Sequence, residues 1–186
     1  MAERVCPWWL GYLLASPLRR LISNPAKLLA PHVQEGMTVL EPGPGMGFFT
    51  LELARLVGPR GRVVVVDMQS RMLDGLKKRV AKAGLLERVD ARLVSRDSMG
   101  LADLAGAVDF ALAYYMVHEL PSADVFFAEI AAALRPGGCL LLAEPAGHVN
   151  AAKFADELKV AAQAGLEVAE RPSVGRSSRG ALLKKA

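Results

Sequence analysis

The chain has 186 residues, of which 52% are hydrophobic and 23% are charged, and its formal net charge is +4. This length suits one domain with a self-sufficient core, and the apolar content argues against a disordered chain. The two cysteines, Cys6 and Cys139, lie far apart and form no CxxC pair, which argues against a disulfide framework or a zinc site. We therefore predict a globular α/β protein of the reducing cytoplasm, without a metal site.

The first thirty or so residues predict a small N-terminal cap. The apolar stretch 5–18 contains two prolines, lacks a cleavage site and is too short to span a bilayer. We interpret it as a lid or docking segment, with peripheral membrane contact as the alternative. Its Trp8 and Trp9 either pack on the body or enclose a substrate. Asn24-Pro25 then predicts the start of a helix that ends near Pro31.

From Met37 onward, β-rich runs alternate with helical ones, which is typical of a parallel sheet covered on both faces. The predicted strands are residues 38–41, 62–66, 89–94, 108–115 and 139–143, followed by a terminal hairpin of 166–170 and 180–184. The predicted helices are residues 48–57, 71–83, 123–134 and 151–163. Ser70 is the expected cap of the second helix, which turns Lys77, Lys78 and Arg79 toward water. Pro136-Gly137-Gly138 is expected to end the third of these helices, ahead of the fifth strand.

The first strand opens into a glycine-rich loop and then a helix. Such a turn places backbone N–H groups and a helix N-terminus against a ligand, and glycine lets that ligand come close. The dinucleotide pattern GxGxxG fails here, because counting from Gly43 gives Gly45 but Phe48 in the third place. Glu41 would repel a pyrophosphate and suits a ligand that carries an ammonium and a sulfonium. A nucleotide-dependent oxidoreductase is therefore disfavoured and stays as an alternative.

Further motifs follow this loop in order. Asp67 ends the second strand, and Arg96-Asp97-Ser98 follows the third. The exit of the fourth strand carries Tyr114-Tyr115-Met116-Val117-His118, and Leu134-Arg135-Pro136-Gly137-Gly138 precedes the fifth. Taken together, the run from Thr38 to Pro145 resembles the class I S-adenosylmethionine-dependent methyltransferases.

The resemblance implies a Rossmann-like α/β fold, with a doubly wound, mostly parallel seven-stranded sheet and a short N-terminal helical extension. We expect a single domain over residues 1–186, with a helical cap at 1–32 and a cofactor-binding core at 33–186. The resemblance also implies that the glycine loop surrounds the methionine part of S-adenosylmethionine, that Asp67 accepts hydrogen bonds from the ribose, and that Asp97 takes the adenine amino group. The predicted cofactor-binding residues are Glu41, Gly43, Gly45, Gly47, Asp67, Met68, Asp97, Ser98 and Tyr114. For Met68 and Tyr114, ordinary packing is the alternative.

The implied reaction is an in-line displacement at the sulfonium, which needs alignment rather than a protein nucleophile. A general base matters only for an acceptor that is protonated at neutral pH, and the candidates are His118, His148 and Tyr115. No Asn-Pro-Pro-Tyr-like run and no Pro-Cys pair is present, so we predict a small-molecule or lipid-like acceptor. An RNA methyltransferase, suggested by the basic tail, and a non-catalytic cofactor-binding subunit are the alternatives. We expect no membrane span and a monomer or homodimer.

Overall fold

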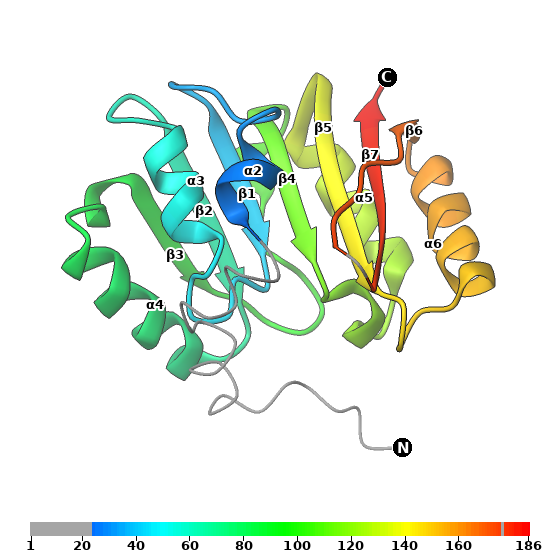
Figure 1. Cartoon of the computed structure of the whole chain (residues 1–186), viewed down its shortest axis with the longest axis horizontal. Coiled ribbons are helices and arrows are strands. Elements are labelled where there is room, and N and C mark those ends of the chain that lie inside the picture. Colours follow the sequence, from blue (N-terminus) through cyan, green and yellow to red (C-terminus); the bar gives the residue numbers. More distant parts are fainter. Residues whose placement is uncertain (1–23, 176) are drawn as a thin grey trace. The chain divides into compact units, whose positions relative to one another are not determined.

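The computed structural model describes residues 24–175 and 177–186 (Figure 1). The apolar stretch with Trp8 and Trp9, and with it most of the predicted cap, lies outside the described residues. The first described helix, α2 (Pro25–Leu29), begins as predicted, because the Asn24 side chain accepts the N–H of Lys27 at 3.2 Å. The chain divides into two compact units, residues 1–96 and 97–186. One domain over 1–186 stays a prediction.

The described part of the first unit, residues 24–96, contains three parallel strands in the order β3-β2-β1. Their bounds are β1 (Thr38–Pro42), β2 (Arg62–Asp67) and β3 (Val89–Leu93). The four valines at 63–66 are buried, as expected of β-branched side chains in a strand covered on both faces. The register pairs Pro42 with Val66 and Asp67 with Leu93. The carboxyl ends of these strands, where the glycine loop begins, therefore lie at one edge.

Besides α2, the described part of the first unit has the helices α3 (Thr50–Leu56) and α4 (Ser70–Lys82) and the short 3-10 turn η2 (Leu86–Arg88). Both strand-to-strand crossovers run in the same direction, so right-handed connections place α3 and α4 on one face (Figure 1). The prediction that Ser70 caps α4 was wrong. Gln69 is the capping residue, and its backbone N–H donates to Asp67 Oδ1 at 2.8 Å, because Asp67 at the strand end reaches the first turn.

The second unit contains four strands in the order β4-β5-β7-β6. Their bounds are β4 (Val108–Tyr114), β5 (Leu134–Pro145), β6 (Leu166–Glu170) and β7 (Ser178–Lys185). β5 runs parallel to β4 and antiparallel to β7, and β7 pairs with β6, which confirms the predicted terminal hairpin. The other elements of this unit are α5 (Ala123–Ala133), α6 (Ala151–Gln163) and the 3-10 turns η3 (Ala102–Leu104) and η4 (Val117–Glu119).

The predicted helix 123–134 ends before Pro136-Gly137-Gly138, at Ala133, but the predicted start of the fifth strand at 139 was wrong, because β5 begins at Leu134 and runs through these residues as a bulge. Val108 pairs with Leu134 but Phe110 pairs with Cys139, so extra residues of β5 are accommodated between these two pairs. A Cβ on Gly138 would lie 3.0 Å from the Val108 carbonyl oxygen, which explains the glycine at this close approach. Across residues 24–175 and 177–186, no helix has the length and apolar content needed to cross a bilayer.

Candidate functional site

Glu41 is a buried carboxylate at the end of β1. Its side chain is 3% exposed, and Oε2 accepts a hydrogen bond from Thr50 Oγ1 at 2.6 Å. The pKa of Glu41 is raised to about 7, mainly because burial disfavours the charged form. The Thr50 hydrogen bond lowers this pKa, and the negative charge of Asp67 raises it. A positively charged ligand beside Glu41 would therefore favour its ionised form.

The loop after β1 has a backbone that only glycine adopts readily. Gly43, Gly45 and Gly47 have φ values of 63°, 54° and 79°. A Cβ on Gly47 would lie 3.1 Å from Leu76 Cγ of α4, whereas a Cβ on Gly45 would have nothing within 4 Å. Helix α4 thus supports the loop at Gly47, and the loop is open at Gly45, where a ligand has room to approach.

Arg79 of α4 also holds this loop. Its Nη1 donates to the Met46 carbonyl oxygen at 2.6 Å, although the predicted helix had Arg79 turned toward water. The Met46 side chain is buried, and a Cβ on Gly75 would lie 3.1 Å from Met46 Cγ. The prediction for Arg79 was therefore wrong. A long side chain on the flank of an amphipathic helix reaches back to the loop that the helix supports.

Asp67 lies beside Glu41 at the neighbouring strand end. Asp67 is half-buried, and its charge contributes to the raised pKa of Glu41, so the structure brings these two predicted residues together. Met68 follows and is 37% exposed. An acidic group and an accessible apolar side chain thus stand side by side at the end of β2.

The remaining predicted cofactor residues belong to the second unit. Asp97 is exposed in the bend that follows Arg96. Ser98 donates from Oγ to Glu129 Oε1 of α5 at 2.5 Å, and the Tyr114 hydroxyl donates to the Val174 carbonyl oxygen at 3.0 Å. Both Ser98 and Tyr114 therefore have partners within the protein that fix their positions.

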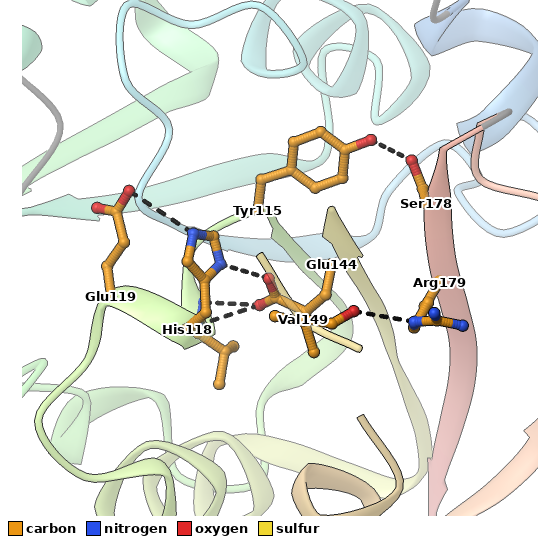
Figure 2. A network of polar contacts seen from close by, with 8 residues as sticks. Tyr115, His118, Glu119, Glu144, Val149, Ser178 and Arg179 are labelled. Carbon is orange, nitrogen blue, oxygen red and sulfur yellow. Dashed lines mark hydrogen bonds and ion pairs between the residues drawn. The ribbon is translucent and has the colours of Figure 1, made fainter. Parts of the chain in front are cut away.

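His118 and Glu144 form a pair at the carboxyl ends of β4 and β5 (Figure 2). His118 Nδ1 lies 2.5 Å from Glu144 Oε2, and the backbone N–H groups of Val117 and His118 donate to Glu144 Oε1 at 2.9 and 3.3 Å. Glu144 is fully buried, and the His118 side chain is 10% exposed. The pKa of His118 is raised, chiefly by its hydrogen bond to Glu144 and against the effect of burial.

The two other predicted base candidates lie near this pair. Among the described residues, Tyr115 is the non-glycine residue with a positive φ, at 62°, and its hydroxyl hydrogen-bonds to Ser178 of β7 (Figure 2). The His148 ring meets the His118 ring edge-on, with a centroid distance of 5.3 Å. The structure thus gathers all three base candidates in the second unit and gives His118 the hydrogen bond to a buried carboxylate.

Glu157 of α6 is a second buried carboxyl group near the His118–Glu144 pair. It is 7% exposed, and its Oε2 has no hydrogen-bond partner among the described residues. The pKa of Glu157 is raised to about 7 by burial and by the negative charge of Glu144, while Lys153 and His118 lower it.

We expect Glu157→Leu to stabilise the protein, more at pH 8 than at pH 5. The carboxyl pKa is about 7 in the folded state and 4.5 in the ordinary case, so folding favours the protonated form. The loss of folding stability that the buried Glu157 carboxyl causes therefore grows as pH rises from about 4.5 to about 7, and it is fully present above pH 7. Removing it should raise the unfolding free energy at pH 8 by about 1–3 kcal/mol. Urea unfolding measures this, with the exposed Asp156→Leu as control, and equal gains at both pH values would contradict it.

Thr50, Arg79, Glu144 and Glu157 were not among the predicted site residues. One signal for Glu144 was present, since Glu144-Pro145 ends a buried strand as Glu41-Pro42 does. The other three lie on helices, where a polar residue at a buried position is visible only once the helix face is known. Within the described ranges, no group of three or more His, Cys, Asp or Glu side chains is arranged to hold a metal ion.

This strand–glycine loop–helix unit, with acidic groups at the ends of β1 and β2, is the arrangement with which α/β proteins bind nucleoside-like ligands outside their strand ends. Comparison with known proteins identifies the family. The profile of a family described as methyltransferase domain matches residues 39–138. The chain therefore belongs to this family, and with it to the class I S-adenosylmethionine-dependent methyltransferases, as the resemblance implied.

Individual relatives agree with this assignment. An arsenite methyltransferase of Halobacterium salinarum is 32% identical over 125 residues, which cover 67% of this chain and 30% of that protein. A ubiquinone/menaquinone biosynthesis C-methyltransferase of Pasteurella multocida is 27% identical over 60% of this chain and 41% of its own length. The chain thus spans less than half the length of these curated relatives.

The fold itself matches a solved structure. A SAM-dependent methyltransferase from Aquifex aeolicus superimposes with a TM-score of 0.87 and 24% identity, over 98% of this chain and 100% of that one. The predicted Rossmann-like methyltransferase fold is therefore confirmed. The described residues supply its seven strands, three in the first unit and four in the second.

Proposed function

We propose that this chain transfers a methyl group from S-adenosylmethionine to a small-molecule acceptor. The observation that carries the proposal is Glu41, a buried carboxylate with a raised pKa at the mouth of a glycine loop. The ionised form of such a buried group is favoured by a positive partner, and S-adenosylmethionine brings an ammonium and a sulfonium. When bound, this cofactor supplies a methyl group activated by the positive sulfur.

The chain's own residues would divide the work of holding the cofactor. Glu41 and the loop with Gly43, Gly45 and Gly47 would hold the methionine part, and the two oxygens of Asp67 can accept from both ribose hydroxyls. Around the adenine we place Met68 as an apolar contact, with Asp97 as the hydrogen-bond acceptor. Ser98 and Tyr114, whose side chains bond to Glu129 and Val174, complete the proposed set of cofactor-binding residues.

The names of the relatives support a small acceptor. They include a methyltransferase of arsenite and one of ubiquinone/menaquinone biosynthesis, and neither name indicates a nucleic-acid substrate. We therefore keep the small-molecule or lipid-like acceptor ahead of RNA. We also propose a cytoplasmic protein that works as a monomer or homodimer, in keeping with its lone cysteines.

Calorimetric titration with S-adenosylmethionine, followed by transfer of its labelled methyl group, tests the proposal. The acceptors offered are arsenite, a naphthoquinol and bulk RNA. Binding followed by labelling of a small molecule is the expected result. Absence of binding to the folded protein would overturn the assignment of the loop. Labelling of RNA alone would favour the RNA alternative, and binding without any labelled product would favour a non-catalytic subunit.

We expect Arg79→Met to weaken S-adenosylmethionine binding by about five- to twenty-fold. The substitution removes the charge-assisted hydrogen bond to the Met46 carbonyl, which is worth about 1.5–3 kcal/mol, and part of that loss should appear as a less ordered loop. Calorimetry measures the affinity. Lys78→Met, at an exposed position of the same helix, is the matched control and should bind normally. Equal affinities for the two variants would show that Arg79 does not shape the loop.

A further inference from the structure

Several residues whose conformation or burial lowers the stability of the fold lie near the carboxyl ends of β4 and β5 in the second unit. Tyr115 has a left-handed backbone, Glu144 is fully buried beside an imidazole, and Glu157 Oε2 has no hydrogen-bond partner within residues 24–175 and 177–186. A buried ion pair contributes little to stability by itself, and an unpartnered buried oxygen lowers it. Backbone strain and shifted pKa values gather at functional sites. The region at the carboxyl ends of β4 and β5 therefore has the properties of a functional site rather than of a region that only stabilises the fold.

The hydrogen bonds around Glu144 decide which nitrogen of His118 carries its proton. Glu144 Oε1 accepts hydrogen bonds from two backbone N–H groups, so this carboxylate acts as an acceptor, and its Oε2 accepts the hydrogen bond that His118 Nδ1–H donates. The lone pair then lies on Nε2. Among the described residues, the nearest charged partner of Nε2 is Glu119 Oε1 at 3.9 Å, which is beyond hydrogen-bond distance.

We propose that His118 Nε2 is the general base of the reaction and that Glu144 is its positioning residue, so that the acceptor atom carries a proton at neutral pH. A phenol or hydroquinone has this chemistry. The inference rests on the proposed function and narrows its acceptor class. In the step, the electron pair of the acceptor atom forms the new bond to the methyl carbon, and the carbon–sulfur pair returns to sulfur. The acceptor's proton moves to Nε2, where Glu144 stabilises the imidazolium, and then leaves to water.

The charges that face His118 come from several elements. Glu144 of β5 and Glu119 of η4 raise its pKa, and Lys153 of α6 lowers it. Glu157 of α6 lies close enough to interact with His118 electrostatically, and the His148 ring lies edge-on. The effect of the carboxylates on the His118 pKa is larger than that of burial and Lys153, so His118 is a stronger base than free imidazole. It accepts a proton only above its raised pKa, and the rate should therefore rise with pH through that value.

The experiment compares wild-type protein with His118→Gln and Glu144→Gln, using 1,4-naphthoquinol as a protic probe and a thioether as an aprotic one. Gln at 118 can still donate to Glu144, so this variant should fold. We expect the naphthoquinol to be methylated and the thioether not. His118→Gln should lower kcat by about 10²–10⁴-fold with S-adenosylmethionine affinity unchanged. Glu144→Gln should move the acid limb of the pH profile to lower pH.

Matched controls are His32→Gln and the exposed Glu170→Gln, both of which should keep the wild-type rate. The imidazole pKa is also measured by NMR, since the chain has only three histidines. An unchanged His118 pKa in Glu144→Gln would overturn the positioning role. A His118→Gln rate within threefold of wild type, or methylation of the thioether alone, would overturn the base. Protein that binds S-adenosylmethionine but methylates neither probe would overturn the acceptor class, whereas absence of binding would overturn the proposed function itself.

Discussion

Replacing Glu41 with Gln is expected to weaken S-adenosylmethionine binding by about 30- to 1,000-fold, since losing one partner of a buried charge pair costs about 2–5 kcal/mol. Gln keeps the shape and can still accept the Thr50 hydrogen bond, but it offers no negative charge. Wild-type affinity should also rise with pH toward and through about 7, because binding selects ionised Glu41. Calorimetry at several pH values measures both effects.

The stability of the same variant separates binding from folding. The pKa of Glu41 is higher in the folded state than its ordinary 4.5, so its penalty grows as pH rises from about 4.5 to about 7. Glu41→Gln should therefore unfold with an equal or higher free energy at pH 8. Glu52→Gln, which affects only the surface pair with Arg55, is the control and should bind normally. Tight binding by Glu41→Gln at pH 8 would refute a charge role for Glu41.

The second large effect is expected from Gly47→Ala, which should lower the free energy of unfolding by about 2–4 kcal/mol. Two causes add here. A φ of 79° is unfavourable for alanine, and the new Cβ would lie 3.1 Å from Leu76 Cγ and 3.5 Å from Thr50 Cβ. The Leu76 contact is tighter than an ordinary one, so the Leu76 side chain or the loop must give by a few tenths of an ångström, and affinity for S-adenosylmethionine should fall as well. Urea unfolding and calorimetry measure the two losses.

Gly84→Ala is the matched control for backbone strain alone. Gly84 has a φ of 70° but nothing within 4 Å of a new Cβ, so only the strain of about 1–2 kcal/mol remains. Its S-adenosylmethionine affinity should be unchanged. If the two alanine variants lose the same stability and bind equally well, close packing of the loop on α4 has no role in binding.

Most secondary structure followed from local patterns. The valines at 63–66 predicted β2, and Asn24 as a cap followed by Pro25 predicted the start of α2. These signals are local because burial of one segment and capping of its own end involve neighbouring residues. The β5 bulge was missed for the opposite reason. Pro-Gly-Gly usually ends a strand, and only pairing with β4 shows that β5 continues through it.

The sequence by itself determined the family, the glycine loop and the two acidic residues at the ends of β1 and β2, Glu41 and Asp67. Glu41 and Asp67 each lie at the end of a buried strand, and the loop follows directly, so their positions in the sequence also place them at the carboxyl ends of the strands. Only the tertiary structure decided which partners act on the functional groups. Arg79 reaches Met46 from 33 residues away, and Glu144 fixes His118 from 26 residues away. Such pairs depend on how helices and strands pack, which no local pattern specifies, and they determine the charge and proton position of the site.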